Sequence, residues 1–153
     1  MKHLLLVLHS QTGSTAALAQ AVLDGARSPD IEGVELRVAS PLSADAADVA
    51  WADAVILGTP ENFGYMSGAL KHFFDRIYYP CLDKTQGLPY ALFIKAGNDG
   101  AGALASVRRI VTGLRWREVQ APVVIVSEVN AAALAACREL GMALAAGLEA
   151  GMF

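Results

Sequence analysis

Four hydroxyl side chains gather in the segment "HSQTGST" at residues 9–15, directly after the apolar run "LLLVL". Gly13 permits a tight turn there, and a helical pattern begins at once. The first turn of a helix carries unpaired backbone N–H groups and a partial positive charge, so it can bind a phosphate without Lys or Arg. We therefore expect this loop to hold a phosphomonoester that stays bound. A plain helix N-cap is the alternative interpretation, although a cap needs only one hydroxyl.

The residue types around this loop exclude several other phosphate chemistries. The chain has no Lys between residues 3 and 70, so the mononucleotide motif GxxxxGK[ST] is absent. A dinucleotide GxGxxG is also absent, and "VELRVAS" ends without the acidic residue that would bind a ribose. The loop has neither the nucleophilic Cys of a low-molecular-weight phosphatase nor the paired acids that precede it in a response-regulator receiver.

Two further segments are polar and rich in glycine, and each follows an apolar run. "GTPENFGYMSGALKHFFDR" occupies residues 58–76, and "KAGNDGAG" occupies residues 95–102. Their glycines allow the backbone to approach a planar ring closely. Packing alone explains an aromatic such as Phe63 in an exposed turn poorly, whereas a flat ligand that stacks there would explain it.

Apolar runs alternate with helical patterns along the whole chain. We expect strands near 3–8, 34–39, 53–59, 89–96 and 122–127, with helices near 13–26, 43–50, 66–79 and 101–115 and in the alanine-rich tail; Ser43 would cap the second helix. This order predicts an α/β fold, a doubly wound five-stranded parallel sheet of order 2-1-3-4-5 with helices on both faces, formed by a single domain over 1–153. Ligands of such sheets bind beyond the carboxyl ends of the strands, here after residues 8, 58 and 96.

Composition narrows the class of protein further. Twelve basic and 15 acidic residues give a net charge of −3, so the chain has no electrostatic footprint for nucleic acid or an anionic membrane. Cys81 and Cys137 have no metal-ligand spacing and are expected to be reduced thiols. Charged residues interrupt the apolar tail, which predicts a packing helix and no membrane span. The N-terminal apolar run is too short for a secretory signal, so we expect a cytoplasmic protein.

Two motifs carry a family resemblance. "SQTGST" matches the flavodoxin pattern [ST]-x-T-G-x-T, and residues 58–76 resemble the G-[ST]-P-x-[YF]-x-G-x-[MS]-x-x-x-L-K-x-F-[IF]-D-R stretch of flavodoxin-like NAD(P)H-dependent FMN and quinone reductases. The resemblance extends over essentially the whole chain. It implies a non-covalently bound FMN, NAD(P)H as the electron donor and a quinone-like acceptor. It implies no catalytic residue and no metal, because hydride and electron transfer belong to the cofactor.

The resemblance also implies which residues contact FMN. The phosphate would rest on Ser10, Gln11, Thr12, Gly13, Ser14 and Thr15. The ribityl chain and the ring edge would follow Thr59, Pro60, Glu61, Asn62, Phe63 and Gly64. The pyrimidine end or the outer ring face would border Ala96, Gly97, Asn98, Asp99 and Gly102.

Two departures from the electron-carrier flavodoxins favour a reductase. The chain has no Tyr after Tyr90 to cover the outer ring face, and its net charge is only weakly negative. A one-electron carrier that docks redox proteins remains an alternative, as does a module of this fold that no longer binds FMN. The larger reductases carry insertions that build a dimer or tetramer, and this chain is too short to carry them. A homodimer is nevertheless left open.

Individual residues leave several questions open. Lys95 ends a central strand, so it either contacts the flavin edge that becomes anionic on reduction or extends to the surface. His9 is either a packed core histidine or a proton donor. Tyr65 either packs or contacts the ring, and Asp75 and Arg76 are expected to form a structural ion pair.

Overall fold

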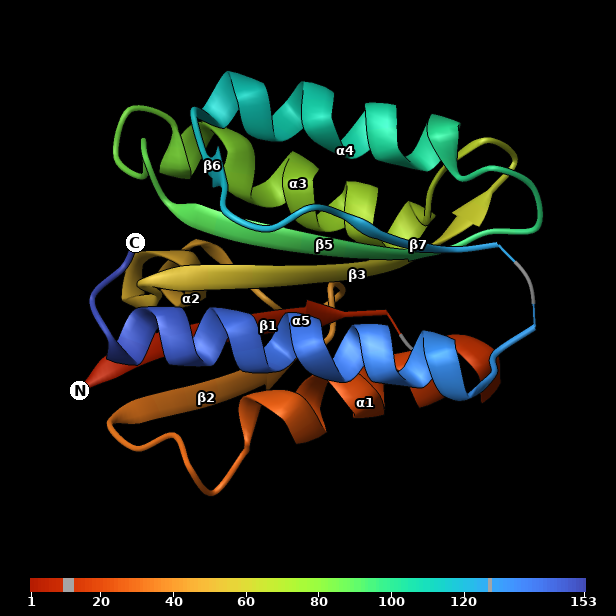
Figure 1. The fold of residues 1–153 in the computed structure, drawn as a ribbon. Coiled ribbons are helices and arrows are strands. Elements are labelled where there is room, and N and C mark those ends of the chain that lie inside the picture. The colour runs from red at the N-terminus through yellow and green to blue at the C-terminus, as the bar shows by residue number, and fades with distance from the viewer. Residues whose placement is uncertain (10–12, 127) are drawn as a thin grey trace.

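The computed structural model describes residues 1–9, 13–126 and 128–153 (Figure 1). Strands and helices alternate along most of the chain. In order they are β1 Lys2–Leu8, α1 Gly13–Ala26, β2 Val34–Ala39, α2 Ala46–Trp51, β3 Ala54–Asn62, β4 Tyr65–Met66, α3 Gly68–Cys81, β5 Pro89–Lys95, α4 Ala101–Leu114, β6 Arg117–Glu118, β7 Val123–Ile125 and α5 Ala131–Glu149.

The centre of the sheet is parallel and has the expected order, β2-β1-β3-β5. In its middle, Leu6 of β1 lies opposite Val38 of β2 and Ile56 of β3. The strand order reverses between β1 and β3, so the switch point lies where the sequence predicts it.

The fifth strand differs from the prediction. Two short strands take its place beside β5: β6 pairs with Pro89 and Tyr90, and β7 pairs with Phe93, Ile94 and Lys95. Between them lies Pro122, which has no N–H to donate to a ladder, so the strand expected at 122–127 begins only at Val123. It ends at Ile125, and residue 127 lies outside the described residues. The sheet therefore has seven strands in the described residues, where the sequence predicted five.

The seventh strand comes from a hairpin that the sequence did not reveal. β3 continues past residue 59 to Asn62, turns, and pairs antiparallel with β4. The two residues of the turn, Phe63 (φ 52°) and Gly64 (φ 71°), both have the positive φ that a two-residue type I′ turn requires. Glycine adopts this conformation readily and phenylalanine seldom does, so the dipeptide Phe-Gly does not indicate a hairpin turn in the sequence.

The short helix α2 begins later than predicted. Its N-cap is Asp45 and not Ser43, because Asp45 and Asp48 form a reciprocal capping box with each other's backbone N–H groups. The hydroxyl of Ser43 donates instead to the carbonyl oxygen of Ser40, within the preceding turn.

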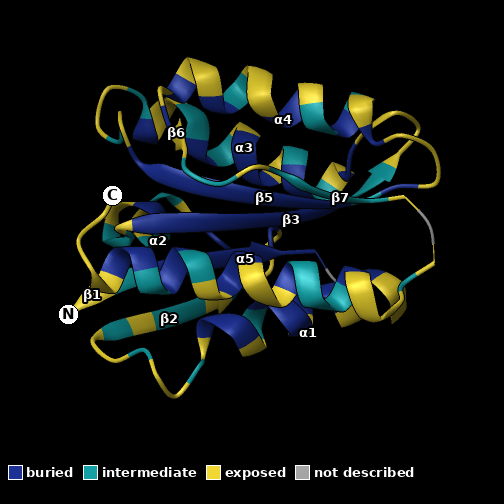
Figure 2. Cartoon of the chain, in the orientation of Figure 1, coloured by how far each residue is buried: buried dark blue, intermediate teal, exposed yellow. Residues whose placement is uncertain are grey.

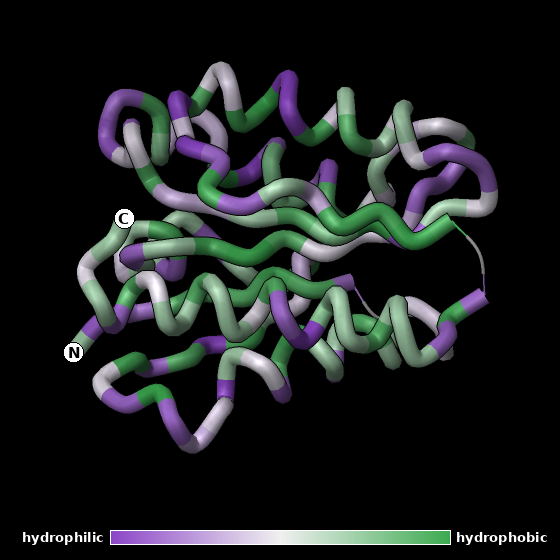
Figure 3. Tube along the Cα trace, viewed as in Figure 1, coloured by the Kyte–Doolittle hydropathy of each residue, from purple (hydrophilic) through white to green (hydrophobic). Residues whose placement is uncertain are grey.

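Helices cover both faces of the sheet (Figure 1). Residues of β1 alternate between them: Leu5 and Val7 pack in the core under α2, α3 and α4, whereas Leu4 and Leu6 pack under α1 and α5. The central strands are accordingly buried and apolar over most of their length, while the outer helix surfaces are exposed (Figures 2 and 3). This two-sided burial fixes the strand ends that form the candidate site.

The alanine-rich tail forms α5, which packs against α1. By length and composition it is the one helix among the described residues that could cross a membrane, but Cys137, Leu140 and Leu144 are buried inside the fold. The contact with α1 is close: a Cβ atom on Gly141 would lie 1.9 Å from the carbonyl oxygen of Val22. These contacts confirm the expected packing helix, and they hold α1 in place.

Candidate functional site

The carboxyl ends of β1, β3 and β5 and the start of α1 lie together at one edge of the sheet, on the side away from both termini (Figure 1). They enclose a cavity of about 210 Å³. Its lining residues come from the ends of β1, β3 and β5 and from the start of α1: His9, Ser14, Thr15, Pro60, Asn62, Lys95, Ala96 and Gly97. Parallel strands and the reversal of strand order bring these segments together, although Ser14 and Ala96 are 82 positions apart in the chain. Ser14, Thr15, Pro60, Asn62, Ala96 and Gly97 were predicted from the sequence.

The predicted phosphate loop leads into the start of α1. Ser10, Gln11 and Thr12 lie outside the described residues. Gly13 is the first residue of α1 and is exposed, and a Cβ atom there would meet nothing within 4 Å. Thr15 is buried, and the first turn of α1 contains no acidic residue. No acidic side chain of this first turn therefore opposes an anion at the positive end of the helix dipole.

Two side chains of the β3 segment have structural partners inside the protein. The buried hydroxyl of Thr59 donates to the carbonyl oxygen of Pro60 (2.8 Å) and accepts from the N–H of Ser67 (2.9 Å). The Glu61 carboxylate accepts a hydrogen bond from the N–H of Ala103 (3.0 Å), in the first turn of α4. These bonds fix the loop relative to α3 and α4. A cofactor contact by either side chain stays a prediction.

The hairpin turn rests directly on the start of α4. A Cβ atom on Gly102 would lie 1.9 Å from the carbonyl oxygen of Gly64, so only glycine fits at residue 102. Next to this contact, the side chain of Phe63 is fully exposed on its strained backbone. An exposed aromatic ring on a rigid turn suits stacking against a ligand, and the predicted flavin contact of Phe63 remains a prediction.

A side chain of the loop after β5 accepts a hydrogen bond from the start of the next helix, α4. Asp99 accepts a hydrogen bond from the N–H of Ala101 (3.0 Å), and the N-cap Gly100 has a φ of 72°. Asp99 therefore supports the start of α4, while Asn98 is exposed and does not line the cavity. Of this loop, the structure brings Ala96 and Gly97 to the cavity.

His9 and Lys95 line the cavity but were not among the predicted cofactor-binding residues. His9 is buried and its backbone N–H donates to the carbonyl oxygen of Gly58 (3.1 Å). Lys95 is half-buried. His9 directly follows β1, and Lys95 is the last residue of β5. The rule that ligands bind beyond the carboxyl ends of parallel strands therefore predicts both positions.

Asp75 and Arg76, near the end of α3, both have structural partners, but they do not form the ion pair with each other that the sequence predicted. Asp75 pairs with Lys71 one turn earlier, in place of Arg76. The Arg76 guanidinium donates to the carbonyl oxygens of Ala44 (2.8 Å) and Pro41 (2.7 Å) and so holds the loop after β2.

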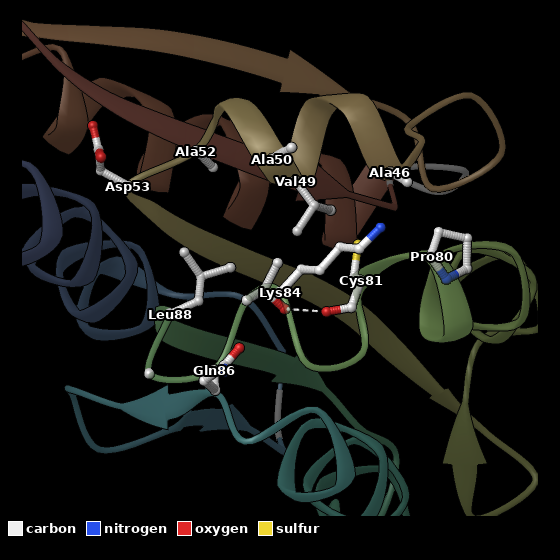
Figure 4. A pocket seen from close by; sticks show the side chains of 12 residues that line it. Ala46, Val49, Ala50, Ala52, Asp53, Pro80, Cys81, Lys84, Gln86 and Leu88 are labelled. Carbon is white, nitrogen blue, oxygen red and sulfur yellow. Dashed lines mark hydrogen bonds between the residues drawn. The ribbon is translucent and has the colours of Figure 1, made fainter.

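A larger cavity of about 370 Å³ lies at the opposite edge, beside α2 and the end of α3 (Figure 4). Asp53, Cys81, Lys84 and Leu88 are among its lining residues. The C-terminal end of α3 at Cys81 brings the negative end of a helix dipole to this cavity, which disfavours a phosphate. Burial raises the pKa of the Cys81 thiol and keeps it protonated. The smaller cavity at the carboxyl edge is therefore the better candidate.

The electrostatics of the carboxyl-edge cavity suit an anion. The described residues that line it include the Lys95 ammonium and no carboxylate, and the Glu61 carboxylate is hydrogen-bonded to α4. Among the residues that the structure describes, no cluster of His, Cys, Asp and Glu is arranged to bind a metal. A phosphate at the start of α1 with an organic body beside Pro60, Asn62 and Ala96 fits this lining.

The family model described as "NADPH-dependent FMN reductase" matches residues 3–131, which includes all three loops. The chain belongs to this family. The description of this family implies FMN as the cofactor. The cavity fits FMN in that its lining includes the first turn of α1 and the Lys95 ammonium, which suit the phosphate.

Individual relatives agree with this assignment. A flavodoxin of Aquifex aeolicus is 33% identical over 74% of this chain and 60% of its own length. An NAD(P)H dehydrogenase (quinone) of Archaeoglobus fulgidus is 34% identical over 49% of this chain and 51% of its own. The chain thus spans about half to three fifths of the length of these curated relatives.

Solved structures confirm the flavodoxin-like fold. An archaeal flavodoxin superposes with a TM-score of 0.76 at 20% identity, covering 97% of this chain and 99% of that one. A flavodoxin, WrbA-like protein from Agrobacterium tumefaciens superposes with a TM-score of 0.73 at 22% identity, covering 99% of each chain.

Proposed function

We propose that this chain is an FMN-binding oxidoreductase that takes electrons from NAD(P)H and passes them to a quinone or a similar small acceptor. One observation carries the proposal: the cavity at the switch point joins the first turn of α1 to the loops after β3 and β5, and the described residues that line it include no carboxylate. Membership of the NADPH-dependent FMN reductase family and the similarity to an NAD(P)H dehydrogenase (quinone) support the choice of activity.

In this proposal the three loops divide the work of binding. The start of α1, with Ser14 and Thr15, binds the phosphate together with Ser10, Gln11, Thr12 and Gly13. The residues that border the ribityl chain and the ring are Thr59, Pro60, Glu61, Asn62, Phe63 and Gly64 from one loop and Ala96, Gly97, Asn98, Asp99 and Gly102 from the other. Bound FMN supplies the hydride and electron chemistry, and the protein orients it and controls access.

Access to one ring face favours a reductase. The loop after β5 contains no aromatic residue, and its residues Gly97, Asn98 and Asp99 are exposed. A nicotinamide or a quinone can approach a ring that no aromatic side chain of this loop covers. No side chain of the site is assigned as a general acid or nucleophile.

An electron carrier is the second candidate function. The similarity to the Aquifex aeolicus flavodoxin favours it, as does the near-complete superposition on the archaeal flavodoxin. Such a protein would bind FMN in the same cavity but would accept electrons from a protein partner.

Anaerobic mixing of the FMN-loaded protein with NADPH or NADH separates the two candidates. The reductase predicts rapid loss of the visible flavin absorbance, followed by recovery when a soluble quinone is added. Flavin that stays oxidised with both nucleotides would refute the reductase and favour the carrier.

Three further features belong to the same proposal. Residues 1–153 act as one FMN-binding domain, and the protein works in the cytoplasm. The proposal leaves open whether the protein is a monomer or a homodimer, which sedimentation of the FMN-loaded protein at several concentrations tests directly.

A further inference from the structure

Lys95 lies on the side of the sheet that faces α1. Along β5, Ala91 and Phe93 pack in the core under α1 and α5, and side chains two residues apart share a face of a strand. Lys95 continues this series at the carboxyl end of the strand. It lines the same cavity as Ser14 and Thr15, the second and third residues of α1.

The Lys95 ammonium has little compensation from the protein. Its Nζ donates to the carbonyl oxygen of the next residue, Ala96, at 3.3 Å, which is long for a charge-assisted hydrogen bond. The ion pairs among described residues do not include Lys95, and no carboxylate is among the described residues that line the cavity. A half-buried cation therefore shares a cavity with the positive end of a helix.

This arrangement is unfavourable for the protein alone and favourable with a dianion between the two positive groups. Ser14 and Thr15 offer hydroxyl donors to the same anion. We propose that Lys95 is a phosphate-binding residue, whose ammonium contacts the FMN phosphate held at the start of α1. The inference rests on the proposed function for the presence of FMN. It adds a positive charge to the phosphate site, because residues 10–15 contain no Lys or Arg.

The proposal assigns Lys95 a role in selecting the cofactor. The phosphate is the part of FMN that riboflavin lacks, so a residue that contacts only the phosphate discriminates between the two. The ring edge, the other group that Lys95 could contact, is common to both flavins. Comparing the two flavins therefore separates a phosphate contact from a ring contact.

The test measures the dissociation constants of FMN and riboflavin by quenching of flavin fluorescence, in the wild type and in Lys95→Met. The matched control is Lys84→Met, because Lys84 lines the cavity at the opposite edge and its loss changes the net charge equally. We expect Lys95→Met to weaken FMN binding about tenfold to a hundredfold, the range for a hydrogen bond to a charged group. Riboflavin binding should change less than about twofold, and Lys95→Arg should restore most of the FMN affinity.

A second readout uses inorganic phosphate and needs no flavin. Phosphate should raise the melting temperature of the wild-type apoprotein and of Lys84→Met, and raise that of Lys95→Met much less. Circular dichroism of each variant checks that it is folded. Equal weakening of FMN and riboflavin, or unchanged FMN and phosphate binding in folded Lys95→Met, would overturn the proposal.

The outcomes separate this inference from the proposed function. Selective loss of FMN and phosphate binding in Lys95→Met supports the inference even if NAD(P)H fails to reduce the bound flavin, a result that refutes only the reductase. A wild type that binds neither flavin refutes the proposed function, and an absence of phosphate stabilisation then refutes the role of Lys95 as well.

Discussion

The carboxylate of Glu61 caps a helix that begins 40 residues later. Its Oε2 lies 3.0 Å from the backbone nitrogen of Ala103 in the first turn of α4, where the N-cap Gly100 offers no side chain. A negative group at this place also complements the helix dipole. The bond ties the end of β3 to α4, and this pairing holds two of the three loops of the cavity in register.

Glu61→Ala should therefore destabilise the protein by about 1 kcal/mol, the usual cost of losing a helix cap. Glu61→Gln retains an acceptor oxygen and should lose less. Urea unfolding of the wild type and both variants measures the difference. Equal midpoints for Glu61→Ala and the wild type would contradict the capping role.

Gly102→Ala should disrupt the contact between the hairpin turn and α4. Its Cβ atom would lie 1.9 Å from the Gly64 carbonyl oxygen, so the turn must move, at a cost of about 1–3 kcal/mol. Gly68→Ala is the matched control, because a Cβ atom there meets nothing within 4 Å. Thermal unfolding should show a lower melting temperature for Gly102→Ala alone. A melting temperature as high as that of Gly68→Ala would mean that the turn adapts freely.

Tyr90 should make stability depend on pH in the alkaline range. Burial raises the pKa of Tyr90 from 10.0 to about 12. The nearby Glu118 carboxylate, which accepts a hydrogen bond from the Tyr90 hydroxyl (3.1 Å), acts in the same direction. The native state thus favours the neutral phenol. Its contribution to the free energy of unfolding, about 2–3 kcal/mol, is fully present below pH 10 and is lost as the pH rises through 12.

Urea unfolding of the wild type and Tyr90→Phe between pH 9 and pH 12 checks this sign. The stability of the wild type relative to Tyr90→Phe should fall across the window, since the variant has no phenol to ionise. A constant difference would show that Tyr90 titrates alike in the folded and unfolded chains.

The two thiols should be inert in the folded protein. Both cysteines are free and buried, and burial raises the pKa of Cys137 to about 11 and that of Cys81 in the same direction. A thiol reagent at pH 8 should react slowly with the native chain and with two thiols per chain in guanidinium chloride. Fast reaction of a native thiol would show that the reagent reaches it in the folded chain, for Cys81 through the cavity that it lines, and would contradict its inertness.

The sequence predicts the central sheet well because its strands are buried on both faces and read as apolar runs. It fails at β3 and β4, since a Phe-Gly turn with two positive φ angles is not a pattern that indicates a hairpin. It also fails at the fifth strand, where Pro122 separates two short strands. Both failures lie where backbone conformation, and not hydrophobic periodicity, decides the structure.

For the site, the strand-end rule located the cavity, but it could not separate residues that face it from residues that support it. Glu61, Asp99 and Gly102 stand in the predicted loops, yet the structure shows them holding α4. Lys95 is the converse case, because it lines the cavity although the sequence did not place it among the cofactor-binding residues. Alternation along β5 places Lys95 on the same face of the sheet as Ala91 and Phe93, but only the structure shows that α1 covers this face.

Equilibrium titration of the purified protein with FMN tests the central claim most directly, with fluorescence quenching as the signal. Binding of one FMN per chain, and weaker binding of riboflavin, would agree with a phosphate cradle at the start of α1. Free FMN fluorescence at every protein concentration would contradict a flavin site at the carboxyl edge of the sheet.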